Sequence, residues 1–145
     1  METFGDTAAG VWLGEVINNC FRETGEDSAQ VDMNLLMHLC KREPKNAQVA
    51  MQVLAQELRT ELKGRPVSEA SGMGLTHRLL VGCIYSAYCL AREVVGRVPL
   101  ELEMIVKFNP EILECAVFVA NSNEENIRNL DRANASVRKP WWKRW

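Results

Sequence analysis

The sequence predicts an all-α protein with a single domain. Apolar residues recur three and four positions apart in several segments, which is the spacing of an amphipathic helix. No segment shows a sustained alternation of apolar and polar residues between turn dipeptides, as half-buried strands would. One segment, residues 79–91, is apolar on nearly every side, which is typical of a helix enclosed by other helices. A chain of 145 residues suits one domain with a core of its own.

The first predicted helix has apolar residues at positions i, i+3, i+4 and i+7, namely Leu13, Val16, Ile17 and Cys20. Thr7 or Asp6 is expected to cap its start, because both side chains can accept a hydrogen bond from the first turn. Gly25 suits its end, and the polar stretch Glu23–Ser28 is expected to form the first loop.

A second helix is expected to begin near Ser28 or Asp32 and to run to about Arg42. Its apolar residues are Val31, Leu35, Leu36, Leu39 and Cys40. Pro44 ends this helix, because proline disfavours the helical conformation at the residue before it.

Asn46 is expected to cap a third helix that reaches about Lys63. The inner face of this helix carries Val49, Val53, Leu54, Leu58 and Leu62. Charged residues at 57, 59, 61 and 63 keep the other face in contact with water. Residues 64–74 are rich in Gly, Pro and Ser and are expected to form a surface loop with room for a short helical turn.

The fourth helix is expected over about residues 76–95 and ends at Gly96. Its most apolar part, 79–91, has about 13 residues, whereas a membrane span needs about 18 or more. We therefore interpret it as a buried central helix.

The rest of the chain predicts three shorter helices. One begins near Pro99, because proline is favoured in the first turn of a helix, and includes Leu102, Ile105 and Val106. Pro110 interrupts the pattern, and residues 111–119 make a sixth helix. After a break at 121–123, a short last helix covers residues 124–134.

Charge and composition exclude several classes of protein. The formal net charge of −2 argues against a general nucleic-acid binder, which needs many basic contacts. The first residues lack the basic and apolar regions of a secretory signal, so we expect an intracellular, reducing compartment. The five cysteines have no metal-ligand spacing and are expected to be packing residues with free thiols: Cys20, Cys40, Cys83, Cys89 and Cys115.

No pattern of catalytic residues stands out. The two histidines, His38 and His77, have no cysteine or serine partner in a known motif, and no glycine-rich phosphate loop follows a strand. Paired acids such as Glu101 and Glu103 are typical of a solvated helix face. We therefore expect a non-enzymatic protein without a metal ion or cofactor.

The fourth helix resembles the first homology motif of the Bcl-2 family of apoptosis regulators. The motif is an arginine, two aliphatic residues, a short apolar run, an aromatic and a small residue. Residues 77–88 read His-Arg-Leu-Leu-Val-Gly-Cys-Ile-Tyr-Ser-Ala-Tyr, in which Arg78 matches the arginine, Tyr85 the aromatic and Ser86 the small position. The family usually has Asn-Trp-Gly before the arginine, whereas this chain has Leu-Thr-His at 75–77.

Two other segments resemble the same family. Residues 39–58, with Pro44 in the middle, are similar to the segment from the family's second helix to its fourth, and residues 12–25 are similar to its first helix. The resemblance covers about residues 10–95. The chain lacks the Gly-Gly-Trp of the second homology motif and has no hydrophobic tail. These departures resemble a divergent or virally encoded member.

The resemblance implies a Bcl-2-like helical bundle over residues 1–145, in which amphipathic helices surround the central helix and form a groove. Such a groove binds the helix that carries the third homology motif of pro-apoptotic partners, whose apolar anchors enter pockets. Arg78 would bind an aspartate of that motif through two charge-assisted hydrogen bonds. The other implied site residues are Leu39 on one wall, Leu54, Leu58, Val81 and Tyr85 on the floor, and His77 beside the arginine.

These site residues also admit a simpler interpretation. The apolar ones would serve equally well in an ordinary core, and Arg78 would then only begin a helix at the surface. The chain has no clear third homology motif of its own, which favours pro-survival sequestration of partners over pro-death action. We expect this sequestration in the cytoplasm, with peripheral association with mitochondria. For a viral protein, the cytoplasm would be that of the host cell. A homodimer is one way to cover an empty apolar groove.

The C-terminal tail, residues 135–145, is basic and aromatic and ends Pro-Trp-Trp-Lys-Arg-Trp. Tryptophan with basic residues suits peripheral contact with a membrane interface. Aromatic residues also suit a dimer or partner contact. The third interpretation is that the tryptophans fold back and complete the core.

A different functional class also fits part of the chain. Residues 46–58 resemble helices of the VHS and ENTH adaptor domains of membrane traffic in their Val-Ala-Met-Gln apolar pattern. The helices of such arrays tend to be amphipathic throughout, so an all-apolar helix at 79–91 fits an array less well.

Overall fold

The computed structural model describes residues 3–25, 28–70, 73–93 and 98–120. This part of the chain folds into a helical body with one short antiparallel hairpin, so the predicted all-α class is confirmed. Its elements in chain order are α1 (Ala8–Cys20), β1 (Phe21–Gly25), β2 (Ser28–Val31), α2 (Met33–Arg42), α3 (Pro44–Leu62), α4 (Met73–Ala91), α5 (Leu100–Phe108) and α6 (Glu111–Ala120). Short 3₁₀ turns at Phe4–Asp6 and Val67–Glu69 precede α1 and α4.

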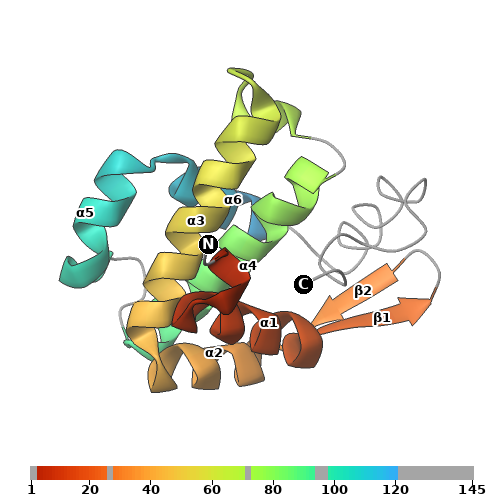
Figure 1. Cartoon of the computed structure of the whole chain (residues 1–145), viewed down its shortest axis with the longest axis vertical. Coiled ribbons are helices and arrows are strands. Elements are labelled where there is room, and N and C mark those ends of the chain that lie inside the picture. The colour runs from red at the N-terminus through yellow and green to blue at the C-terminus, as the bar shows by residue number, and fades with distance from the viewer. Residues whose placement is uncertain (1–2, 26–27, 71–72, 94–97, 121–145) are drawn as a thin grey trace.

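The first helix begins as predicted and ends earlier. The Thr7 side chain caps α1 by accepting a hydrogen bond from the Gly10 backbone N–H at 3.0 Å. The helix stops at Cys20 and not at Gly25, because the chain turns there into a hairpin that pairs Phe21 with Val31. The predicted loop Glu23–Ser28 is therefore wrong in part, since β1 and β2 occupy both of its ends. Figure 1 shows this hairpin extending away from the helical body.

The helices α2 and α3 meet at Pro44. Asp32 caps α2 by accepting from the Leu35 N–H at 3.0 Å, which settles the two predicted starts in favour of Asp32. The prediction that Asn46 caps α3 is wrong: Pro44 is already in the first turn, where its missing N–H leaves no bond unmade. The Asn46 side chain instead donates to the carboxylate of Glu43. Lys63, in the left-handed conformation with φ 52°, ends α3.

The fourth helix is the centre of the body. It begins at Met73, three residues before the predicted start, and its most extensive contacts are with α2, α3 and α6. Between these helices nearly all of its apolar residues are buried: Leu79, Leu80, Val81, Cys83, Ile84, Tyr85, Ala87, Tyr88 and Cys89. Figure 1 shows α4 crossing the middle of the molecule behind α1. One cluster of buried residues joins α4 to the other helices, so the described residues share one core.

Helices α5 and α6 follow the central helix. Pro99 precedes α5, and its carbonyl accepts the first hydrogen bonds of the helix. Figure 1 shows α5 at the left edge of the body, where it contacts α3 and α6. Helix α6 packs on α4 at Gly82, where a Cβ atom would clash with the Cys115 carbonyl and with Val119. Glycine at this position allows the two helices to approach closely.

Several expectations concern residues outside the described part of the chain. These are the last helix at 124–134 and the basic, aromatic tail at 135–145. The prediction that the fourth helix reaches residue 95 is wrong, because α4 ends at Ala91 and Glu93 has a positive φ of 58°. Among the helices that the structure describes, none combines the length and the apolar character needed to span a bilayer.

Candidate functional site

The residues predicted to form the site gather around α4, and most of them are deeply buried. Leu39 comes from α2, Leu54 and Leu58 from α3, and the remaining four lie on α4 itself. The exposed fractions are 2% for Leu39, 0% for Leu54, Leu58 and Val81, 9% for Tyr85 and 2% for His77. In this structure the apolar members are part of the common core and offer little or no surface to a partner.

Tyr85 and His77 have specific polar environments within that core. Burial raises the pKa of the Tyr85 hydroxyl to about 12, so the phenol stays protonated at neutral pH. The His77 Nε2 lies 2.7 Å from a carboxylate oxygen of Glu57, which joins α4 to α3. A buried imidazole needs such a partner, so this contact fixes the orientation of the ring.

Arg78 is the predicted site residue with a special environment. It is half-buried in the second turn of α4, and its guanidinium carbon lies 4.2 Å from the centre of the Phe118 ring on α6. This is a cation–π contact across the α4–α6 interface. The Arg78 Nε is buried and has no hydrogen-bond acceptor, and no carboxylate of the described residues forms an ion pair with the guanidinium.

An unpaired buried Nε on a cation is an uncommon feature, because almost all buried polar atoms in folded proteins have a partner. The aromatic ring satisfies the charge from one side and supplies no oxygen to the N–H groups. The planar guanidinium presents its donors as a fork that matches a carboxylate. The Arg78 guanidinium therefore carries a fork of donors that no carboxylate of the described residues pairs with.

Helix α6, which carries Phe118, also has apolar residues at the surface. Leu113 and Val117 are 39% and 59% exposed and lie one turn apart, and Val117 directly precedes Phe118. Cys115, on the buried side of α6, lies close enough to Arg78 for the positive charge to favour its thiolate. Burial has the larger effect and raises the pKa of Cys115 to about 12, so this thiol is not a nucleophile at neutral pH.

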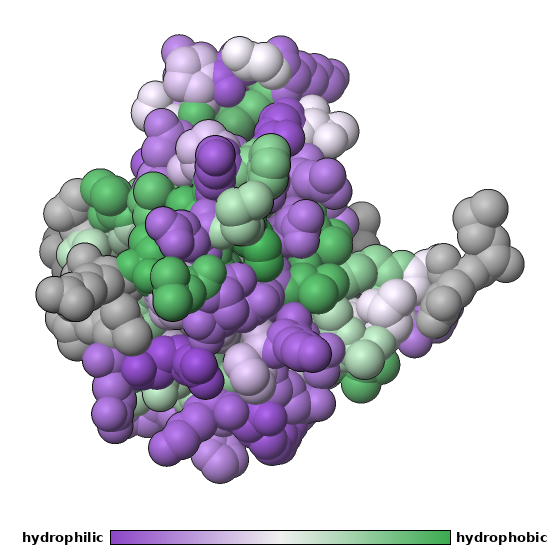
Figure 2. All heavy atoms as spheres, turned by 90° about the vertical axis from the view of Figure 1, so that its left-hand side faces the viewer, coloured by the Kyte–Doolittle hydropathy of each residue, from purple (hydrophilic) through white to green (hydrophobic). Residues whose placement is uncertain are grey.

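Sequence reasoning missed a second exposed apolar surface, on α5. Leu100, Met104 and Phe108 are 83%, 58% and 68% exposed, while Leu102 and Val106 on the other side of the helix are buried. Figure 2, which faces the α5 side of the molecule, shows apolar residues on this surface between polar ones. The sequence signal was available, because the fifth helix carries apolar residues four apart on two different faces.

Polar networks hold α5 at both ends. At its start, the Tyr88 hydroxyl accepts from Gln48 at 2.7 Å and donates to Glu101 at 2.9 Å, and Arg92 pairs with the same carboxylate. Hydrogen bonds from its own backbone N–H and from Tyr88 lower the pKa of Glu101.

After the C-terminal end of α5, a second network holds the chain to α3. Arg59 donates to the side chain of Asn109 at 3.1 Å and pairs with Glu111, and both of these residues are buried. The network therefore fixes the connection between α5 and α6.

The described residues offer little for catalysis or metal binding. They contain no group of three or more His, Cys, Asp or Glu side chains that could hold a metal ion. Surface hollows of about 330 and 380 Å³ lie near the two ends of α5, and each is lined by both acidic and basic side chains. No His, Cys, Ser or Thr is among the residues that line either hollow.

The features that stand out are a half-buried arginine without a carboxylate ion pair among the described residues, and exposed apolar residues on α6, the helix that it contacts. Comparison of the chain with protein-family models, with curated proteins and with solved structures found no match.

Proposed function

We propose that this protein binds an amphipathic helix of a partner protein, and that the helix carries the third homology motif of pro-apoptotic Bcl-2 family proteins. By holding this helix, the protein sequesters the partner and favours cell survival. The observation that carries the proposal is the Arg78 guanidinium, which is half-buried over Phe118 and has no ion pair with a carboxylate of the described residues.

The Arg78 site matches the acidic part of the ligand. The third homology motif carries an aspartate, which would pair with the terminal nitrogens of the half-buried Arg78 guanidinium, since the Nε itself is buried. Two parallel N–H···O bonds to a carboxylate form a strong, geometrically specific contact. Because the aromatic ring already shields one side of the guanidinium, the ion pair is screened less by water than a fully exposed pair.

The apolar part of the ligand requires exposed apolar surface near Arg78. Leu113 and Val117 provide exposed apolar surface on α6, the helix that also carries Phe118. An amphipathic helix lying along α6 would cover these two residues with its apolar face and direct its aspartate to Arg78. This placement differs from the groove implied by the sequence resemblance, whose floor residues Leu54, Leu58 and Val81 are fully buried.

The position of α4 supports this class over the VHS and ENTH alternative. The helix is enclosed by α2, α3 and α6, whereas helices of a stacked array contact mainly their neighbours. Sequestration of a pro-apoptotic partner would take place in the cytoplasm, with the protein at or near the mitochondrial surface.

The direct test is binding of a fluorescent third-homology-motif peptide. Arg78→Ala is expected to weaken binding at least tenfold, which corresponds to about 1.4 kcal/mol. The matched control is Arg42→Ala, because Arg42 is exposed and is already paired with Glu15 and Glu43. A peptide with its aspartate changed to alanine should bind the wild-type protein as weakly as the intact peptide binds Arg78→Ala.

Two results would contradict the proposal. If the wild-type protein binds no third-homology-motif peptide, the assigned ligand is wrong. If Arg78→Ala binds the peptide as tightly as Arg42→Ala does, Arg78 is not the contact. A thermal-shift comparison with acidic-dileucine peptides and ubiquitin tests the adaptor class, because a ligand of the native state raises the melting temperature.

A further inference from the structure

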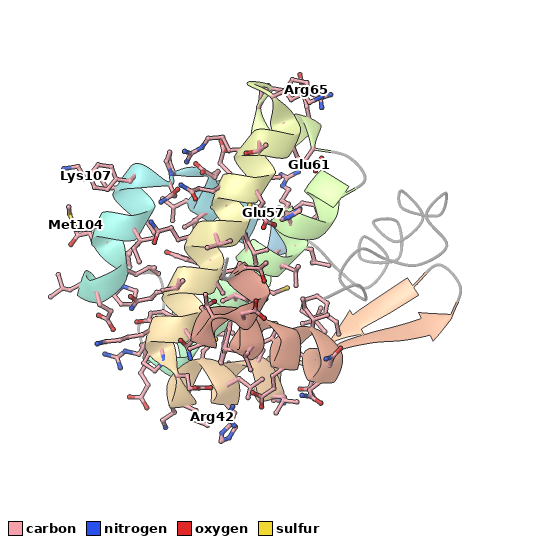
Figure 3. All side chains as sticks on the ribbon, in the orientation of Figure 1. Arg42, Glu57, Glu61, Arg65, Met104 and Lys107 are labelled. Carbon is pink, nitrogen blue, oxygen red and sulfur yellow. The ribbon has the colours of Figure 1, made fainter. Side chains whose placement is uncertain are left out.

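Helix α5 presents an apolar stripe that no other described element covers. Leu100, Met104 and Phe108 follow one another at intervals of four residues and are each more than half exposed. Over two helical turns the stripe extends about 12 Å along the helix. Figure 3 shows Met104 pointing away from the helical body on the outer side of α5.

The stripe belongs to a helix that is held firmly in place. Leu102 and Val106 are buried, Glu101 is bound by Tyr88 and Arg92 at one end, and Asn109 is bound by Arg59 just beyond the other. The outer face therefore keeps its shape without a partner. A preformed face loses little conformational entropy when it binds.

The charges beside the stripe complement a second copy of the same helix. Glu103 and Lys107 are both exposed and lie one turn apart on the same flank of the stripe. When two identical helices pack antiparallel, each flank faces the same flank of the other copy, in the opposite direction. Glu103 then lies opposite Lys107 of the second copy, and symmetry repeats the pair.

We propose that α5 is a self-association surface through which two copies of this chain form an antiparallel helix pair. Met104 lies near the two-fold axis, and Leu100 of one copy packs beside Phe108 of the other. The two Glu103–Lys107 pairs set the antiparallel direction, as flanking charges do in helical dimers. A nine-residue helix provides less than the about 800 Å² per partner of a standard interface, so the dimer is weak and reversible.

The first test is sedimentation equilibrium of the full chain over concentrations from about 1 to 500 μM, the range expected for a small interface. The wild-type protein should change from monomer to dimer across this range. Met104→Glu should weaken the dimer at least tenfold, because it places a charge at the centre of the apolar contact. Val11→Glu is the matched control, because Val11 is 63% exposed on α1 and lies outside the proposed surface.

The second test examines the direction of pairing by exchanging the flanking charges. Glu103→Lys and Lys107→Glu should each weaken the dimer about threefold or more at low ionic strength, because like charges then face one another. The double variant E103K/K107E restores opposite charges across the interface and should recover the wild-type dimer. In a parallel pair this flank faces the opposite flank of the other copy, so Glu103 and Lys107 would not pair with one another and the double exchange would not be a rescue.

Three results would overturn the proposal: a chain that stays monomeric at the highest concentration, a dimer that Met104→Glu leaves intact, or a double exchange that fails to restore pairing. Sedimentation with anionic vesicles separates a membrane surface from a second copy. Vesicle binding by a strictly monomeric protein, lost in Met104→Glu, would assign the stripe to the membrane. Because Arg78 lies on a different helix, Arg78→Ala should leave the dimer unchanged, so this test is independent of peptide binding.

Discussion

Leu58 illustrates at the scale of one residue how an apolar helix face acquires its role. It lies on α3 with no exposed surface, and its neighbours on the same face, Leu54 and Leu62, are also buried. Burying a leucine side chain contributes about 1.5–3 kcal/mol relative to leaving it exposed. In this structure Leu58 therefore contributes to folding, and any effect of its substitution on ligand binding should follow from lost stability.

Leu58→Ala should lower the free energy of unfolding by about 2–5 kcal/mol, the usual cost of removing a buried leucine and leaving a cavity. Val11→Ala, at a side chain that is 63% exposed, should change it by less than about 0.5 kcal/mol. Urea denaturation followed by circular dichroism measures both. A near-neutral Leu58→Ala variant that nevertheless loses peptide binding would place Leu58 in an open groove and contradict its burial.

The sequence identified Arg78 and did not identify what surrounds it. Its position at the start of the central helix follows from the apolar run after it. Its contact with Phe118 joins two residues 40 positions apart, and the resemblance that predicted the site fades before residue 118. The pairing of His77 with Glu57 also depends on how α4 lies against α3. Helical spacing within one segment carries no information on such contacts.

At the scale of elements, the predicted features that proved correct depend on local chemistry. Caps at Thr7 and Asp32 involve a side chain and a backbone N–H three residues apart, so a short stretch of sequence contains the whole interaction. The β-hairpin involves pairing between separate segments, Phe21 with Val31 among them. Neither segment alone determines this pairing, so sequence patterns predict a loop where part of the hairpin lies.

The close contact between α4 and α6 requires a residue without a side chain at position 82, and this requirement can be tested. A methyl group at this position would meet the Cys115 carbonyl and Val119, so α6 must shift to admit it. Gly82→Ala should therefore lower the free energy of unfolding by about 1–3 kcal/mol, the range for overpacking, in spite of the better helix propensity of alanine. Thermal unfolding monitored by circular dichroism measures the change.

Gly14→Ala is the matched control for the helix interior. Gly14 lies within α1, and nothing stands within 4 Å of the Cβ that alanine would add. This substitution should raise stability by about 0.5–1 kcal/mol, because alanine favours a helix over glycine. Equal stabilisation by both substitutions would show that α6 does not pack on Gly82 as described.

Helix α5 shows why its two apolar faces could not be told apart from sequence. Leu102 and Val106 face the core, whereas Leu100, Met104 and Phe108 face outward, and both sets have helical spacing. Only the position of α5 relative to α3 and α6 decides which set is buried. Leu102 and Val106 are buried on folding, so only the exposed residues of α5 are free to contact another molecule.

The five cysteines of the molecule all lie in the common core, and they come from four different helices. Cys20 is on α1, Cys40 on α2, Cys83 and Cys89 on α4, and Cys115 on α6, and all are buried. Burial raises the pKa of Cys40, Cys83 and Cys115 to about 12 and also raises that of Cys89. Because the thiolate is the reactive form, each raised pKa lowers reactivity in the folded protein.

Iodoacetamide at about pH 8 should therefore label the native protein very slowly, since a thiol of pKa about 12 is roughly one part in ten thousand thiolate there. In denaturant all five thiols should be labelled within minutes, and intact-mass spectrometry counts the adducts. Native labelling should begin at Cys89, which is 8% exposed near the end of α4, and reach Cys83 last, because Cys83 reacts only when the central helix opens. Early labelling of Cys83 under native conditions would mean that α2, α3 and α6 do not enclose α4.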